Sequence, residues 1–239
     1  MSKDQVRARI LEIGIVPVVG VPSSQEARFV AEALAAGGIP VVEVTTTVPG
    51  GIEILREVVK NQPNVLVGAG NVLGVENARR CLEAGAQFLV TPGLNLKTLE
   101  YAVHEKKFIM TGALTPTEVI TAWQAGSDFV KVFPCAQVGG PQYIRALLGP
   151  FPDVPLVPTG GVNLRTAAEF IAAGAVALGV GAELVQKAAL KSHAHDVIRD
   201  TARRFLEVVQ EARTWAASRD LAAGRGTRSA RNLHSGTTG

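Results

Sequence analysis

The chain has 239 residues, of which 47% are hydrophobic and 19% are charged, and its formal net charge is +3. This composition excludes a chain that is disordered throughout, and at this length it favours one α/β barrel or two smaller domains. Because residues 217–239 carry four arginines and one acid while the rest of the chain is electrically balanced, the charge does not indicate a nucleic-acid partner.

Short runs rich in β-branched residues alternate along the chain with longer runs rich in Ala, Leu and Glu. The short runs predict eight strands, at residues 15–19, 41–45, 65–68, 88–90, 108–110, 129–133, 155–157 and 176–179. The longer runs predict helices, among them residues 25–36, 75–84, 96–104, 116–125 and 164–173. Glycine follows several of these helices, as is common at a helix C-terminus.

The strands start 20 to 26 residues apart, which leaves room each time for a crossover helix and two loops. Strands that are apolar on both faces are typical of a parallel sheet covered by helices. We therefore predict an α/β fold, a single-domain (β/α)8 TIM barrel over residues 1–216. An open doubly wound sheet is the alternative, although no GxGxxG motif opens a helix after the first strand. Residues 217–239, rich in Gly, Ser and Thr, are predicted to be a disordered basic tail.

Some classes of partner are not expected from this sequence. No apolar run reaches the roughly 18 residues of a membrane helix, and the N-terminus, MSKDQVRARI, lacks the apolar stretch of a signal peptide. We therefore expect a cytoplasmic protein without a membrane partner. His193 and His195 have no third ligand at a spacing suited to zinc, so no metal is expected.

Lys131 is the polar residue that most strongly indicates a function. Of the eight lysines, only this one, in SDFVKVFP, is flanked on both sides by strand-forming apolar residues. Period-two alternation places it on one face with Phe129 and Phe133, so it would point into the barrel. Burial favours the neutral amine, which is the nucleophile in Schiff-base chemistry. The alternative is a structural lysine paired with an internal acid.

Glu43, in VVEVTTTVPG, is the candidate partner of Lys131. It lies in the middle of the second strand and shares a face with Val41 and Thr45. An inward carboxylate can act as the general acid and base that carbinolamine formation requires. A purely structural ion pair would have the same sequence pattern.

Glycine-rich motifs end four of the predicted strands: GAGN, TPG, PTGG and GVGA. Glycines at these positions allow close approach of the backbone and leave amide N–H groups free for an anion. PTGG and GVGA end the seventh and eighth strands, whose loops commonly form a phosphate site in barrels.

The motifs VVEVTTTVP, GAGNVL, FLVTPGL, GALTPTE, FVKVFP, GPQYIRALLGPFP, VPTGGVN and ALGVGAELV occur in order between about residues 10 and 190. Together they resemble the family of 2-keto-3-deoxy-6-phosphogluconate (KDPG) aldolase, which includes 4-hydroxy-2-oxoglutarate (KHG) and 2-keto-3-deoxy-6-phosphogalactonate aldolases. The resemblance implies a homotrimeric class I aldolase without metal or cofactor. Such an enzyme cleaves a small-molecule 2-keto acid to pyruvate and an aldehyde.

The resemblance also implies site residues. Lys131 matches the Schiff-base lysine and Glu43 the acid/base. Phe133 matches an aromatic residue beside the lysine, Pro92 one that shapes the pyruvate pocket, and Thr159 a threonine that contacts the keto acid. The positions that match the phosphate loops are Gly160, Gly161, Val180, Gly181 and Ala182.

Three positions depart from the family pattern. Thr47 stands where many members have a carboxylate-binding arginine, and Asn71 stands where a hydroxyl is usual. Ala182 replaces the serine of the phosphate loop and is followed by Glu183, which should weaken phosphate binding. These changes concern the substrate more than the type of reaction.

The leading hypothesis is cleavage of KDPG to pyruvate and glyceraldehyde 3-phosphate. A close alternative is cleavage of KHG to pyruvate and glyoxylate, or of another 4-hydroxy-2-keto acid. Two alternatives of a different class are a phosphate-sugar epimerase or isomerase and a non-catalytic barrel.

Overall fold

The computed structural model describes residues 1–222 of the chain, and side chains as far as residue 219. Eight parallel strands follow one another around a barrel in the order β7-β6-β5-β4-β3-β2-β1-β8, and a bridge between Thr159 and Gly179 joins the two ends. The strands are β1 (Ile15–Val19), β2 (Val41–Thr45), β3 (Leu66–Gly70), β4 (Phe88–Val90), β5 (Phe108–Ala113), β6 (Phe129–Val132), β7 (Leu156–Pro158) and β8 (Leu178–Val180). The predicted (β/α)8 barrel is confirmed, and the open sheet is wrong.

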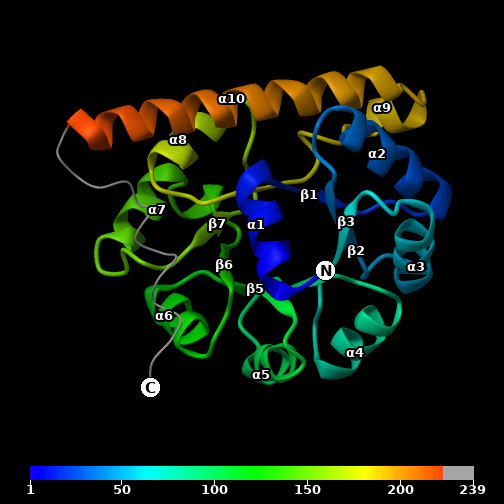
Figure 1. The fold of residues 1–239 in the computed structure, drawn as a ribbon, viewed down its shortest axis with the longest axis horizontal. Helices are drawn as coiled ribbons and strands as arrows, with labels where there is room; N and C mark the ends of the chain where they lie inside the picture. The colour runs from blue at the N-terminus through cyan, green and yellow to red at the C-terminus, as the bar shows by residue number, and fades with distance from the viewer. Residues whose placement is uncertain (223–239) are drawn as a thin grey trace.

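Helices surround the barrel and alternate with its strands (Figure 1). They are α1 (Lys3–Ile13), α2 (Ser24–Ala36), α3 (Gly51–Asn61), α4 (Val75–Glu83), α5 (Leu96–His104), α6 (Pro116–Gln124), α7 (Pro141–Leu148), α8 (Ala167–Ala172), α9 (Lys187–Lys191) and α10 (His195–Ala222). A 3-10 turn, Ala136–Val138, precedes α7.

Local sequence explains where several of these helices begin. At α6, the Thr115 side chain accepts a hydrogen bond from the Glu118 N–H, and the Glu118 carboxylate accepts one from the Thr115 N–H. This capping box, with Pro116 in the first turn, satisfies N–H groups that have no partner inside the helix. Ser2 and Gln5 form the same arrangement at α1.

The strand bounds predicted for β1, β2 and β4 agree with the structure, and the other strands shift by one to three residues at an end. β5 continues to Ala113 because Gly112 and Ala113 pair with Lys131 and Val132 of β6. Such pairing depends on the neighbouring strand, so the apolar run 108–110 alone did not reveal it.

The N-terminal end of the barrel is filled by a layer of aromatic rings. Phe88, Phe108 and Phe129 each open a strand and are fully buried, with edge-to-face ring centroids 6.5 Å and 5.0 Å apart. Gly68 on β3 leaves the space that the Phe88 ring occupies. Edge-to-face rings of this kind make a packed core at this end.

Helix α1 covers the same end of the barrel (Figure 1). The Arg7 guanidinium lies 5.4 Å from the centre of the Phe129 ring and donates a hydrogen bond to the Asp128 carbonyl. Lys3 forms an ion pair with the Asp128 carboxylate at 3.1 Å. Because this end is closed, the C-terminal ends of the strands form the open mouth.

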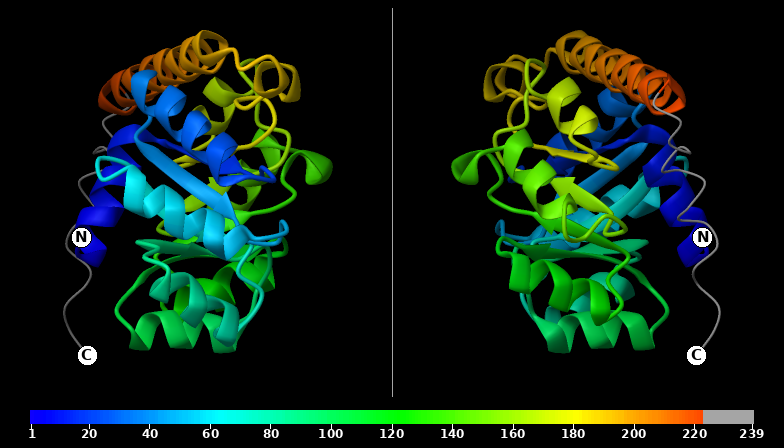
Figure 2. Two further views of the ribbon diagram at one scale, coloured as in Figure 1. Left: turned by 90° about the vertical axis from the view of Figure 1, so that its right-hand side faces the viewer. Right: turned by 90° about the vertical axis from the view of Figure 1, so that its left-hand side faces the viewer.

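Helix α10 lies along one side of the barrel and packs against α2 and α8 (Figures 1 and 2). Ala202, Phe205 and Val209 of α10 are fully buried. Further along the helix, the Arg213 guanidinium donates hydrogen bonds to the carbonyls of Glu12 and Val176, at 3.1 Å and 3.0 Å. These contacts fasten α10 to the segments that precede β1 and β8.

The predicted start of a disordered tail at residue 217 is wrong for residues 217–222, because α10 continues to Ala222. The buried residues of α10 and Arg213 anchor the preceding turns, and the Arg219 guanidinium stacks 4.8 Å from the Trp215 ring. Propagating an anchored helix costs less than starting one. The rest of the predicted tail, 223–239, lies outside the described residues.

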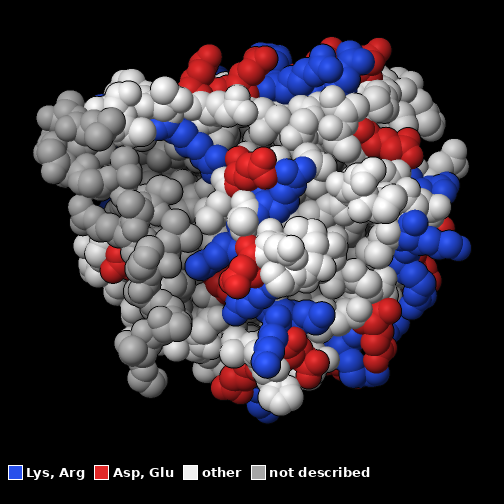
Figure 3. Space-filling model, viewed as in Figure 1, with Lys and Arg blue, Asp and Glu red and all other residues white. Residues whose placement is uncertain are grey.

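On the face that carries α1, basic and acidic side chains are interspersed (Figure 3). Within residues 1–222, no helix is both long enough and apolar enough to span a membrane. The same residues hold no group of three or more His, Cys, Asp or Glu side chains placed to bind a metal ion.

Candidate active site

Lys131 of β6 and Glu43 of β2 meet inside the mouth of the barrel. Their side chains are 3% and 1% exposed, and Lys131 Nζ lies 3.7 Å from Glu43 Oε1. The two strands stand on opposite sides of the eight-stranded ring, so the pair spans the interior. The structure thus brings together the two residues that strand periodicity predicted to point inward.

Burial dominates the electrostatics of Glu43. Loss of solvation raises the pKa of its carboxyl group above the ordinary value, and the nearby Lys131 ammonium opposes that rise. Glu43 Oε1 is buried and has no hydrogen-bond partner among the described residues. A carboxylate that is short of hydrogen bonds readily takes up a proton, which is the property of a general base.

Glycines on neighbouring strands make room for the site's side chains. The Glu43 carboxylate lies against the Cα of Gly70 on β3, where a Cβ would overlap Oε1. Thr159 at the end of β7 lies in the same way against Gly179 of β8, where a Cβ would overlap its hydroxyl. These glycines are therefore required for space.

Phe133 and Pro92 lie just beyond the C-terminal ends of β6 and β4. The Phe133 ring is 38% exposed, and its centre is 5.5 Å from Lys131 Nζ. Pro92 follows β4 and is half-buried. An aromatic face at this distance attracts an ammonium group.

Thr47 and Asn71 lie together beyond the ends of β2 and β3. Asn71 Nδ2 is 3.5 Å from the Thr47 hydroxyl, the long limit of a hydrogen bond. Thr47 is exposed and Asn71 is half-buried. The two departures from the family pattern thus form one uncharged pair of hydrogen-bonding groups at the mouth.

The glycine-rich ends of β7 and β8 are adjacent because Thr159 pairs with Gly179. Gly160 and Gly161 have left-handed backbone angles, with φ of 88° and 79°. Gly181 is half-buried and Ala182 is exposed, while the Val180 side chain is buried in the core. Val180 therefore contributes to this surface through its backbone alone.

Glu183 is exposed. It lines a cavity of about 230 Å³ outside these loops, together with Asn163, Leu164, Arg165, Gln186, Thr201, Arg204 and Phe205.

Cys135 has no role as a nucleophile. It is fully buried, and burial raises the pKa of its thiol to about 12. A thiol in that state carries too little thiolate to react at neutral pH.

The sequence interpretation missed two residues of the site, Thr91 and Gly112. Thr91 is buried directly before Pro92, and Gly112 pairs with Lys131 in the β5–β6 register. The TPG motif includes Thr91. Its hydrogen-bond partner, Gly112, lies on the next strand, so the local sequence pattern could not identify the contact.

A lysine and a carboxylate buried together at the mouth of a (β/α)8 barrel fit the chemistry of a Schiff-base enzyme. Comparison with known proteins identifies the enzyme family. The sequence model of the KDPG and KHG aldolase family matches residues 6–201, so the match ends within α10. The chain belongs to this family, which decides against the isomerase alternative.

Individual relatives support the same family assignment. The chain is 32% identical to 2-dehydro-3-deoxy-phosphogluconate aldolase of Pseudomonas aeruginosa over 82% of this chain and 91% of that protein. It is 34% identical to the KHG/KDPG aldolase of Escherichia coli K12, over 81% and 91% of the two chains. A crystal structure of KDPG aldolase from Legionella pneumophila, with pyruvate captured as a covalent carbinolamine, superposes with a TM-score of 0.78 at 30% identity. That superposition covers 83% of this chain and 97% of the other.

The contact between Glu43 and Gly70 predicts the effect of a single methyl group. In Gly70→Ala the new Cβ would overlap Glu43 Oε1, so the carboxylate must move away from Lys131. We expect kcat for aldol cleavage to fall about 100-fold, the loss that an error of about 1 Å in position can cause. Steady-state kinetics measure this, with circular dichroism to check the fold.

Gly74→Ala is the matched control, because a Cβ at Gly74 meets nothing within 4 Å. We expect its kcat to stay within about twofold of the wild type. Equal activity of the two variants would show that the position of Glu43 does not matter.

Proposed function

We propose that this chain is a class I aldolase that cleaves KDPG to pyruvate and glyceraldehyde 3-phosphate through a Schiff base on Lys131. The observation that carries the proposal is the buried Lys131–Glu43 pair, 3.7 Å apart at the mouth of the barrel. Membership of the KDPG and KHG aldolase family supports the same reaction.

The first half of the reaction makes the imine. The neutral amine of Lys131 attacks the C2 carbonyl of the keto acid and forms a carbinolamine. Glu43 then donates a proton to the departing hydroxyl, and water leaves as the protonated imine forms. The raised pKa of Glu43 suits this step, because a carboxyl group of raised pKa holds its proton closer to neutral pH.

The second half breaks the carbon–carbon bond. The Glu43 carboxylate, directly or through water, takes the proton of the C4 hydroxyl, and the aldehyde forms as the C3–C4 bond breaks. The electron pair of that bond moves into the protonated imine and gives an enamine of pyruvate. Protonation at C3 and hydrolysis of the imine release pyruvate and restore the Lys131 amine.

The other residues of the mouth bind the substrate in this proposal. Phe133, Pro92 and Thr159 surround the pyruvyl part next to Lys131, and Thr47 with Asn71 binds the carboxylate through neutral hydrogen bonds. The backbone amides of the β7 and β8 loops bind the phosphate, with Gly160, Gly161, Val180, Gly181 and Ala182 as the residues concerned.

A second candidate substrate is KHG, which carries no phosphate. It is favoured by Ala182, which offers no hydroxyl to a phosphate, and by the neighbouring carboxylate of Glu183. We propose KDPG as the better substrate because the left-handed turn at Gly160 and Gly161 leaves the backbone of the β7 loop open to an anion. A phosphorylated sugar acid is too highly charged to cross a membrane unaided, so we further propose a cytoplasmic location.

Borohydride trapping tests the covalent step. Treatment with pyruvate and sodium borohydride should add one reduced pyruvyl group per chain, and peptide mapping should place it on Lys131. Lys131→Ala should give no adduct and no aldol cleavage. Lys191→Ala, at an exposed lysine of α9, is the matched control and should react like the wild type. Folded wild-type protein that forms no adduct would overturn the mechanism.

A comparison of substrates tests the phosphate. We expect kcat/KM to be higher for KDPG than for KHG. Ala182→Ser restores a hydroxyl donor and should increase kcat/KM for KDPG several-fold, as one added hydrogen bond to a charged group can, with no change for KHG. Ala188→Ser, at an exposed alanine of α9, should change neither value. A preference for KHG in the wild type would favour the second candidate instead.

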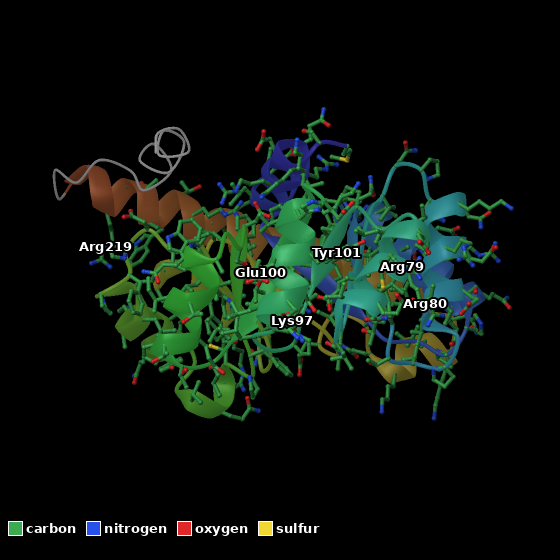
Figure 4. The ribbon with its side chains drawn as sticks, turned by 90° about the horizontal axis from the view of Figure 1, so that it is seen from below. Arg79, Arg80, Lys97, Glu100, Tyr101 and Arg219 are labelled. Atoms are coloured by element: carbon green, nitrogen blue, oxygen red, sulfur yellow. The ribbon has the colours of Figure 1, made fainter. Side chains whose placement is uncertain are left out.

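We also propose that the protein is a homotrimer, as the family resemblance implies. The outer faces of α4 and α5 lie side by side and carry charged side chains, among them Arg79 and Lys97 (Figure 4). Three apolar side chains are exposed at the N-terminal ends of these helices: Leu73 (61%), Val75 (38%) and Leu96 (41%). Exposed apolar side chains beside charged ones are typical of an interface between subunits.

Leu73→Asp should dissociate the trimer, because it replaces the most exposed of these three apolar side chains with a charge. Analytical ultracentrifugation should show a monomer for this variant and a trimer for the wild type. Leu11→Asp changes an exposed leucine of α1 at the opposite end of the barrel and should remain trimeric. A trimeric Leu73→Asp variant would place the interface elsewhere.

A further inference from the structure

A buried threonine fastens the turn after β4 to the neighbouring strand. Thr91 is 1% exposed. Its hydroxyl oxygen accepts a hydrogen bond from the Gly112 N–H at 2.9 Å and donates one to the Gly93 carbonyl at 2.8 Å. The Thr91 N–H also donates to the Met110 carbonyl at 3.1 Å. One side chain therefore links β5 to the far end of the turn.

The partner of Thr91 on β5 is a glycine because a side chain would not fit there. A Cβ at Gly112 would overlap the Pro92 carbonyl group and the Gly93 nitrogen. The Pro92–Gly93 peptide thus lies directly on the backbone of Gly112.

This contact is next to the reactive lysine. Gly112 of β5 is the residue that pairs with Lys131 of β6. The Pro92–Gly93 peptide follows β4 and lies against β5. It is therefore held one strand away from Lys131 of β6. The mechanism above gives Thr91 no chemical step, and its hydroxyl is already occupied by two protein partners.

We propose that Thr91 is a positioning residue, which holds the Pro92–Gly93 peptide against Gly112 and so fixes the wall of the pocket where the keto acid meets Lys131. This inference rests on the proposed function. Thr91 acts through the peptide and does not touch the substrate. Without its hydroxyl, the Gly93 carbonyl and the Gly112 N–H lose their partner, and the turn is free to move away from β5.

Thr91→Val tests the inference, because it removes the hydroxyl and keeps the branched shape. We expect KM for the keto acid to rise about tenfold, and the rate of borohydride trapping with subsaturating pyruvate to fall by a similar factor, with a smaller change in kcat. Thr91→Ser keeps the hydroxyl and should restore KM to within about twofold of the wild type.

Thr98→Val is the matched control for the loss of a buried threonine hydroxyl. Thr98 is fully buried on α5, and its Oγ1 has no hydrogen-bond partner among the described residues. This variant should leave KM and trapping unchanged. Gly112→Ala provides a second test from the other side of the contact and should raise KM as Thr91→Val does.

The outcomes separate this inference from the proposed function. No pyruvate adduct in the wild type would overturn the proposed function. A wild-type adduct that forms equally fast in Thr91→Val, with unchanged KM, would overturn only the role of Thr91. A lowered Tm with unchanged KM, or a KM that Thr91→Ser does not restore, would mark Thr91 as merely structural. If Thr91→Val does not fold, Gly112→Ala decides the question, because its added Cβ would overlap the Pro92–Gly93 peptide. A raised KM in that variant supports the inference, and a wild-type KM overturns it.

Discussion

The burial of Lys131 beside Glu43 is the constraint on which the rest of the structure depends. Removing a charged group from water is costly, and the 3.7 Å pair compensates in part through attraction. Glu43 Oε1 has no hydrogen bond among the described residues, so the pair is not optimised for stability. Groups kept in this state are common at reactive sites, because substrate supplies the missing interactions.

The two ends of the barrel are packed differently, and this difference isolates the polar pair. At the N-terminal end, phenylalanine rings and α1 form a closed, packed core. At the C-terminal end, strand glycines take the place of large side chains, so that Glu43 and Thr159 can lie sideways against the next strand. Space for a substrate above Lys131 therefore comes from residues that have no side chain. In the same way, Gly112 admits the backbone of the turn after β4.

In the proposed function, the mouth binds an anionic substrate with few charges of its own. Thr47 and Asn71 replace charged or hydroxyl groups that are usual in the family, and they form one neutral pair at the ends of β2 and β3. The turn that contains Gly160 and Gly161 offers backbone groups at the opposite side. Recognition that rests on neutral hydrogen bonds requires fixed geometry, because each bond contributes little by itself. The contacts that hold the loops in place are thus as important to binding as the groups that touch the substrate.

The sequence by itself determined the number of strands and the inward direction of Lys131 and Glu43, and it favoured a barrel over an open sheet. These follow from the period-two alternation of apolar residues and from the spacing of the strands, which are local properties. Only the tertiary structure decided that Glu43 and Lys131 are close enough to react together, that Thr91 holds the turn beside Gly112, and that α10 continues to Ala222. Each of these depends on contacts between segments that are distant in the chain, such as the two hydrogen bonds of Arg213. Local patterns specify which face a side chain occupies, whereas packing across the barrel sets its distance from another side chain.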